Sequence, residues 1–196
     1  MAKSDKRWLR RHVTDPYVIR AKAQGYRSRA AFKLIEINEK EKFLRPGAAV
    51  VDLGAAPGSW SQVAAERVKP GGRVIAIDLL PVVPISGVTI LRGDFREQVL
   101  KEKADVVLCD VSPNLSGIAD VDQARLAELA FAAIDFCRNV LKPEGVFLIK
   151  AFHGEAFGAL SARLKKSFAS VKVVKPQASR GESRETYVVA RGLPAL

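Results

Sequence analysis

The sequence predicts one α/β domain in which a mostly parallel sheet is covered by helices on both faces. Short apolar runs rich in Val, Ile and Leu recur along the chain, and segments with the apolar spacing of helices separate them. Such runs are typical of strands buried on both faces of a parallel sheet. The length of 196 residues suits a single domain, which we expect over residues 15–196 after a basic, flexible tail at residues 1–14.

Two helices are expected before the first strand, over residues 17–23 and 28–42. Asp15 and Pro16 are typical of a helix start, with an acid at the N-cap and proline in the first turn. Gly25 ends this helix, and Ser28 is expected to cap the second one. The second helix then carries Lys33 near its middle.

From residue 46 onward, strands and helices alternate. Strands are expected at residues 50–53, 73–79, 88–91, 105–109, 145–149, 171–174 and 186–190. Helices are expected at residues 59–68, 122–141 and 155–167. The chain shows no internal repeat and no sign of a second domain.

The turn after the first strand has the composition of a ligand-binding loop. Gly54 and Gly58 bracket Ala55, Ala56 and Pro57, so few side chains keep a ligand away from the backbone. The two glycines are four residues apart and no G-x-G-x-x-G is present. This spacing disfavours a dinucleotide and favours a ligand without phosphates. A plain strand-to-helix turn is the alternative.

Charged residues lie at or just after the ends of five predicted strands. They are Asp52, Asp78, Asp94, Asp110 and Lys150. Ligands of open α/β sheets bind beyond these carboxyl ends, and a buried, unpaired carboxylate is costly. A single acid of this kind is commonly a helix N-cap, but the repeated placement indicates a site. Asp78 is placed to accept hydrogen bonds from ribose hydroxyls, and Asp94 to accept one from an adenine amino group.

The net charge of +11 is concentrated at the two ends of the chain. Residues 1–33 hold ten Lys and Arg against two acids, and residues 151–196 hold eight against three, while the middle is close to neutral. This segregation predicts a polyanion bound by the basic N-terminal segment and the C-terminal basic residues, with RNA or DNA as the default partner. A merely solubilising tail is the alternative.

Several protein classes are disfavoured. No apolar run approaches the roughly 18 residues of a membrane span, and residues 1–11 lack the apolar core of a secretory signal. Cys109 and Cys137 form no CxxC pair and are expected to be buried thiols, which suits a reducing cytoplasm. His12 and His153 are isolated, so no metal site is expected.

Five segments together resemble the FtsJ/RrmJ family of S-adenosylmethionine-dependent RNA ribose 2′-O-methyltransferases. They are DLGAAPGSWSQ, AIDL, GD at residues 93–94, CDVSPN and LIKAF, and the resemblance runs over residues 28–191. It implies a Rossmann-like methyltransferase fold with a seven-stranded sheet whose last strand is antiparallel. It also implies contacts with S-adenosylmethionine from Gly54, Pro57, Gly58, Trp60, Asp78, Asp94 and Asp110. Ser59 stands where the family pattern has glycine (DLGAAPGGW), a change that should be tolerated.

The same resemblance implies a catalytic set of two lysines and two acids. These are Lys33 in SRAAFKL, Asp110, Lys150 and Glu185 in SRETY. Because a hydroxyl is a poor nucleophile at neutral pH, a positioned base helps, and Lys150 is the candidate. Lys150 must be neutral to act, a state that burial or a neighbouring cation such as Lys33 favours. Asp110 is expected to orient Lys150, and Glu185 to orient Lys33 or the ribose.

The resemblance implies a uridine of large-subunit (23S-type) ribosomal RNA as the substrate, in the A-loop of the assembled subunit. The segment at 110–114 has no aromatic residue to stack a flipped base, which favours ribose over base chemistry. The alternatives are the same reaction on tRNA or another structured RNA, and an rRNA-binding assembly factor. The missing glycine motif weakens a further alternative, an NAD-dependent oxidoreductase. The protein is expected to be a monomer.

Overall fold

The computed structural model describes residues 14–112, 116–179 and 183–194. Within them, a seven-stranded sheet has the order β3-β2-β1-β4-β5-β7-β6. Apart from its last residue, the basic tail predicted at residues 1–14 lies outside the described part of the chain. The order places β1 and β4 at the centre of the sheet, so that the turns after these strands lie side by side.

The strands are β1 (Ala49–Leu53), β2 (Arg73–Asp78), β3 (Val88–Arg92), β4 (Ala104–Cys109), β5 (Leu141–Phe152), β6 (Ser170–Val174) and β7 (Glu185–Arg191). Strands β1 to β5 pair in parallel, whereas β7 runs antiparallel to both β5 and β6. The predicted sheet, mostly parallel with an antiparallel last strand, is confirmed. Strand β5 is longer than expected at both ends because Leu141 pairs with Ala104 and Phe152 pairs with Glu185.

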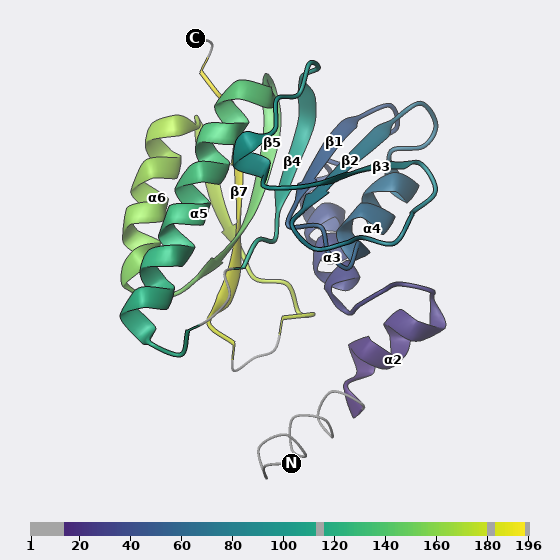
Figure 1. Ribbon diagram of the computed structural model, residues 1–196, viewed down its shortest axis with the longest axis horizontal. Coiled ribbons are helices and arrows are strands. Elements are labelled where there is room, and N and C mark those ends of the chain that lie inside the picture. The colour runs from purple at the N-terminus through teal and green to yellow at the C-terminus, as the bar shows by residue number, and fades with distance from the viewer. Residues whose placement is uncertain (1–13, 113–115, 180–182, 195–196) are drawn as a thin grey trace.

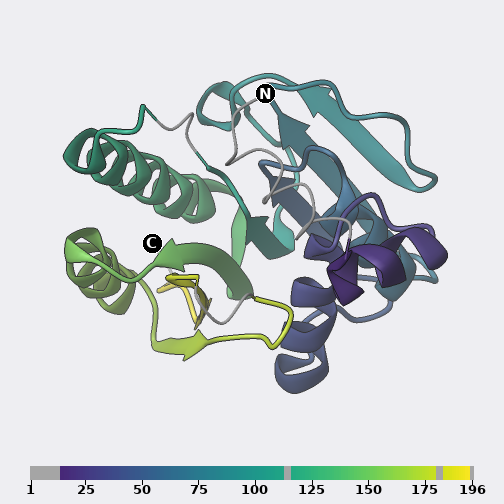
Figure 2. The same cartoon turned by 90° about the horizontal axis from the view of Figure 1, so that it is seen from below.

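The helices are α2 (Pro16–Ala23), α3 (Ala30–Glu41), α4 (Ser59–Arg67), α5 (Ala119–Val140) and α6 (Glu155–Ser167). A short 3₁₀ helix, η1 (Phe95–Glu97), was not expected from the sequence. Helices α5 and α6 cover one face of the sheet, and α3 and α4 cover the other (Figures 1 and 2). None of the described helices is long and apolar enough to cross a membrane.

The start of α2 is as predicted, but the start of α3 is not. The Asp15 carboxylate accepts a hydrogen bond from the Tyr17 amide at 3.0 Å, and proline follows the cap. The N-cap of α3 is Arg29 rather than Ser28. Ser28 Oγ accepts only a long hydrogen bond from the Ala30 amide, 3.2 Å, because its hydroxyl pairs with Ser59 Oγ at 2.8 Å.

Side-chain alternation along the strands carries the polar residues to one face of the sheet. Val50, Val146 and Val189 pack in the core beneath α3 and α4. Alternate residues of a strand share a face, so Asp52, Lys150 and Glu185 fall on this same side, at the carboxyl edge of the parallel strands. Lys33 reaches that edge from α3.

Candidate active site

A cleft of about 390 Å³ opens at the carboxyl edge of the sheet, between the segments that follow β1, β2, β3 and β4. Its polar lining includes the carboxylates of Asp78, Asp94 and Asp110, and Gly54 contributes backbone. Apolar side chains such as Leu79 and Phe95 complete the walls. A volume of this size, with a few converging polar groups on an apolar lining, is typical of a small-molecule site.

Gly54 allows the turn after β1 to pack against the segment after β4. Its φ of +72° lies in the left-handed region, and a Cβ there would lie 2.9 Å from both Cα and Cγ2 of Val111. The amides of Gly54 and Ala55 both donate to the Ile77 carbonyl, at 3.0 and 3.3 Å. The turn is therefore held between β2 and the residue that follows Asp110, which leaves its backbone bordering the cleft.

Asp78 is fixed at the end of β2 by two backbone amides. Its Oδ2 accepts from the Ala56 amide at 2.8 Å, and its Oδ1 from the Leu80 amide at 2.7 Å. Each carboxylate oxygen keeps a second lone pair. The acid is thus oriented in advance, as hydrogen bonding to ligand hydroxyls requires.

Asp94 follows β3 and lines the cleft, but its carboxylate already has a partner. Arg96 Nε lies 3.0 Å from Asp94 Oδ1 and 2.9 Å from Oδ2. Hydrogen bonds from the Arg96 side chain lower the pKa of Asp94. The Arg96 side chain is 46% exposed and that of Asp94 is 17% exposed, so a ligand amino group at Asp94 would share the carboxylate with Arg96. No sequence pattern pointed to Arg96.

Asp52 is fully buried beneath the turn. Its Oδ2 accepts from Ser61 Oγ at 2.6 Å, while its Oδ1 has no hydrogen-bond partner among the described residues. Burial raises the pKa of Asp52 to about 7, with smaller contributions from the carboxylates of Asp110 and Asp78 and an opposing one from the Ser61 hydroxyl. Asp52 therefore titrates near neutral pH.

Of the remaining predicted cofactor residues, Trp60 does not line the cleft. Its side chain is buried, its ring centroid lies 5.8 Å from that of Tyr187, and its Nε1 donates to the Ala30 carbonyl at 2.9 Å. Trp60 and Pro57 line a smaller adjoining cavity of about 40 Å³, which Gly54 and Asp110 share with the cleft. Trp60 thereby holds α4 against α3 and β7. Gly58 is the N-cap of α4.

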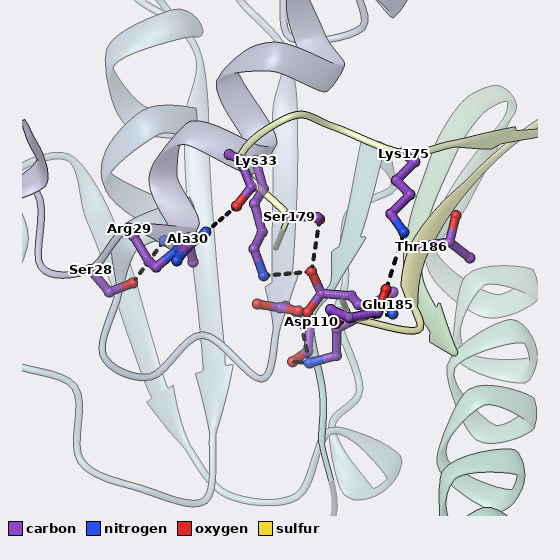
Figure 3. A network of polar contacts seen from close by, with 12 residues as sticks. Ser28, Arg29, Ala30, Lys33, Asp110, Lys175, Ser179, Glu185 and Thr186 are labelled. Atoms are coloured by element: carbon purple, nitrogen blue, oxygen red, sulfur yellow. Dashed lines mark hydrogen bonds and ion pairs between the residues drawn. The ribbon is translucent and has the colours of Figure 1, made fainter. Parts of the chain in front are cut away.

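The four predicted catalytic residues form two ion pairs. Lys150 Nζ lies 2.9 Å from Asp110 Oδ1 and also donates to the Asp110 carbonyl at 3.0 Å. Lys33 Nζ lies 2.6 Å from Glu185 Oε1. Figure 3 shows Lys33 reaching from α3 toward Glu185, with Asp110 close by. Both pairs are largely withdrawn from solvent, since the side-chain exposures of all four residues are 22% or less.

Tyr187 brings the two pairs together. It lies opposite Lys150 in the β5–β7 register, and the Lys33 Nζ lies 5.8 Å from its ring centroid. Burial raises the pKa of the Tyr187 phenol, and the nearby carboxylates of Asp110 and Glu185 raise it further, so the phenol stays neutral. Both ion pairs therefore border one neutral aromatic side chain.

Ser179 is a further contact of this cluster that sequence reasoning missed. Its Oγ donates to Glu185 Oε1 at 3.0 Å, the oxygen that also accepts from Lys33. Burial alone would raise the pKa of Glu185, but the Lys33 ammonium and the hydrogen bonds from Lys33 and Ser179 outweigh it and hold the pKa below its usual value. Glu185 is therefore an anion at neutral pH.

No group of three or more His, Cys, Asp or Glu residues in the described ranges is arranged to hold a metal ion. Pro113 and Asn114 of the segment CDVSPN lie outside the described residues.

Comparison with known proteins points to one family. The profile of the FtsJ-like methyltransferases matches residues 26–193. The chain is 52% identical to the ribosomal RNA large subunit methyltransferase E of Azoarcus sp. (strain BH72), over 95% of this chain and 96% of that protein. It is 48% identical to the protein of the same name from Marinobacter nauticus, over 97% of each chain.

Solved structures agree with these sequence matches. A ribosomal RNA methyltransferase of Plasmodium falciparum superposes with a TM-score of 0.77 and 29% identity, covering 86% of this chain and 98% of that one. The fibrillarin of Aeropyrum pernix, 17% identical, shares the fold with a TM-score of 0.60, covering 82% of this chain and 73% of that one. With a family match that spans most of its length and curated relatives about half identical over nearly all of it, this chain belongs to the FtsJ-like methyltransferases.

Proposed function

We propose that the protein transfers a methyl group from S-adenosylmethionine to the ribose 2′ hydroxyl of a uridine in large-subunit ribosomal RNA, in the A-loop of the assembled subunit. The observation that carries the chemistry is the two partly buried ion pairs beside the cleft, Lys150 with Asp110 and Lys33 with Glu185. The RNA is proposed from the relatives, whose names specify the large ribosomal subunit.

The residues of the cleft fit the proposed cofactor. Its volume of about 390 Å³ lies within the range of small-molecule sites. Asp78 offers oriented oxygens to ribose hydroxyls, Asp94 offers an acceptor to an amino group, and the carboxylates suit a cationic ligand better than a phosphate. When bound, the cofactor supplies an activated methyl group on a sulfonium.

Lys150 is the group that receives the hydroxyl proton. In its neutral form it accepts the proton from the ribose, and the ammonium that results is held by Asp110 Oδ1 at 2.9 Å and by the Asp110 carbonyl at 3.0 Å. The position of Asp110 on the wall of the cleft supports this role, because Asp110 contacts both the cleft and Lys150.

Lys33 and Glu185 position the ribose. Glu185 is anionic and fixed by Lys33 and Ser179, so it offers an acceptor to a sugar hydroxyl in a defined place. The Lys33 ammonium lies above the Tyr187 ring, where its remaining N–H groups can reach a phosphate or ribose oxygen.

The basic N-terminal segment and the C-terminal basic residues are proposed to bind RNA phosphates, and the protein to act as a monomer in the cytoplasm. Cys109 and Cys137 support this compartment, since both are buried free thiols.

A labelling experiment tests the function. The protein is incubated with methyl-labelled S-adenosylmethionine and, separately, with large ribosomal subunits, free large-subunit rRNA, small subunits and tRNA. We expect label on the large subunit and one 2′-O-methyluridine in the A-loop after nuclease mapping. Label on tRNA alone would overturn the rRNA assignment, label on a base would overturn the ribose chemistry, and no transfer with a fully bound cofactor would favour an assembly factor.

A further inference from the structure

Arg27 is one of the basic residues near the N-terminus, but its side chain is occupied within the protein. Its Nη1 donates to the Pro57 carbonyl at 2.7 Å and its Nη2 to the Pro84 carbonyl at 2.9 Å. Pro57 belongs to the turn after β1, and Pro84 belongs to the β2–β3 loop, residues 79–87. One guanidinium therefore connects two segments that border the proposed cofactor site.

The fit of Arg27 against the turn is close. A Cβ added to Gly58, whose φ is +111°, would lie 2.7 Å from both Arg27 Nη1 and Ile85 Cδ1. The backbone amide of Arg27 donates to Gln62 Oε1 at 2.9 Å, and Gln62 Nε2 donates to the Gly25 carbonyl at 3.0 Å. The segment between α2 and α3 is thus fixed to α4, which holds the guanidinium in place over Gly58.

The β2–β3 loop has little packing of its own. Leu79 and Leu80 are each 64% exposed and Val83 is 70% exposed. A loop with few buried apolar contacts opens locally at low cost in free energy. Val82 and Ile85 of this loop lie against Gly58, and Arg27 adds the hydrogen bonds that fix the loop relative to the turn. Leu79 and Leu80 line the cleft.

We propose that Arg27 is a positioning residue for cofactor binding, which fixes the spacing between the turn at 54–58 and the loop at 79–87, rather than an RNA phosphate contact. The proposal rests on the cofactor proposed above. To reach a phosphate, the guanidinium would have to give up both carbonyls. Arg27 reaches the two carbonyls through two nitrogens of a planar group, and the single nitrogen of a lysine ammonium does not reproduce this spacing, so Arg27→Lys disturbs the connection.

The test compares Arg27→Lys, which keeps the charge, with Lys22→Met, which removes an exposed cation from the neighbouring helix α2. Binding of S-adenosylmethionine without RNA is measured by calorimetry, and RNA binding is measured against salt concentration. For Arg27→Lys we expect the cofactor Kd to rise about tenfold, which is about 1.4 kcal/mol, and the cofactor KM to rise with it. The kcat should stay within about threefold of wild type, and the salt dependence of RNA binding should be unchanged. For Lys22→Met we expect an unchanged cofactor Kd and a shallower salt dependence, because one phosphate contact is lost.

Hydrogen exchange gives a second measurement that a general loss of stability would not reproduce. In Arg27→Lys, amides of residues 79–87 should exchange faster while those of β1 and β4 keep their protection. Wild-type cofactor affinity in Arg27→Lys, or a loss confined to RNA binding, would overturn the proposal. If the wild-type protein itself bound no S-adenosylmethionine, the proposed function would fail instead, so the two failures are distinguishable.

Discussion

Replacing Lys150 with Met tests the central chemical claim. The variant keeps most of the side-chain length but removes the ammonium that lies 2.9 Å from Asp110 Oδ1. A positioned general base typically contributes about 10²- to 10⁴-fold to a rate, so transfer at saturating cofactor and RNA should fall by that factor, about 3–5 kcal/mol in the barrier. Lys150 does not line the 390 Å³ cleft, so the cofactor Kd should stay within about threefold of wild type.

The structure also sets the expected cost in stability. Removing one partner of a buried ion pair costs about 3–5 kcal/mol. The Asp110 side chain is 22% exposed, so water can partly rehydrate its carboxylate once the lysine is removed. We therefore expect a smaller loss, about 1–2 kcal/mol in the free energy of unfolding. The folded population at 25 °C should therefore stay close to that of wild type, and the rate can be measured on folded protein.

Strand β5 supplies a matched control. Lys142 lies at its opposite end and is also paired with an aspartate, with its Nζ 2.6 Å from Asp105 Oδ1. Lys142→Met removes a lysine–aspartate ion pair at the other end of the strand, one that is more exposed, with side-chain exposures of 48% and 35%. It should leave both transfer and cofactor binding unchanged. Single-turnover transfer of labelled methyl groups by the two variants is the assay. A Lys150→Met enzyme within about threefold of the wild-type rate would refute the role of Lys150.

Three further predictions concern the turn and its acids. The folded pKa of Asp52, about 7, lies above the ordinary value of 3.8, so the folded chain binds this proton more tightly and loses stability as pH rises between those values. Between pH 4 and pH 8, the free energy of unfolding of Asp52→Asn, measured in urea, should therefore rise relative to that of wild type by up to about 4 kcal/mol. Parallel pH profiles of the two proteins would contradict the raised pKa of Asp52. Asp78→Asn should raise the cofactor Kd, measured by calorimetry, about tenfold or more. The two carboxylate oxygens of Asp78 each accept from a backbone amide, whereas asparagine offers only one acceptor oxygen. An unchanged Kd would remove Asp78 from the site. Gly54→Ala should destabilise the fold by about 1–3 kcal/mol more than Gly47→Ala. Both glycines have a positive φ, but only at Gly54 would a Cβ contact Val111. Equal losses of stability in thermal unfolding would argue against that contact.

The secondary structure was predictable because it depends on local patterns. Apolar runs and helical spacing placed every strand of the sheet and the long helices, with differences mainly at their ends. The convergence of Asp78, Asp110 and Lys150 was also predictable, because the carboxyl ends of parallel strands share one edge of a sheet. η1 could not be foreseen, since a single turn leaves no periodic signal.

The partners of the polar residues depended on the tertiary structure. Lys33 and Glu185 are 152 positions apart, and their pairing required the docking of α3 against β7. Arg96, rather than open solvent, faces Asp94, and Arg27 donates to two carbonyls rather than pointing to solvent. The sequence by itself determined the sheet, its helices and the edge at which charged residues gather. Contacts such as those of Arg27 with Pro57 and Pro84 were decided by packing, because they join segments whose order in the chain does not determine their distance in space.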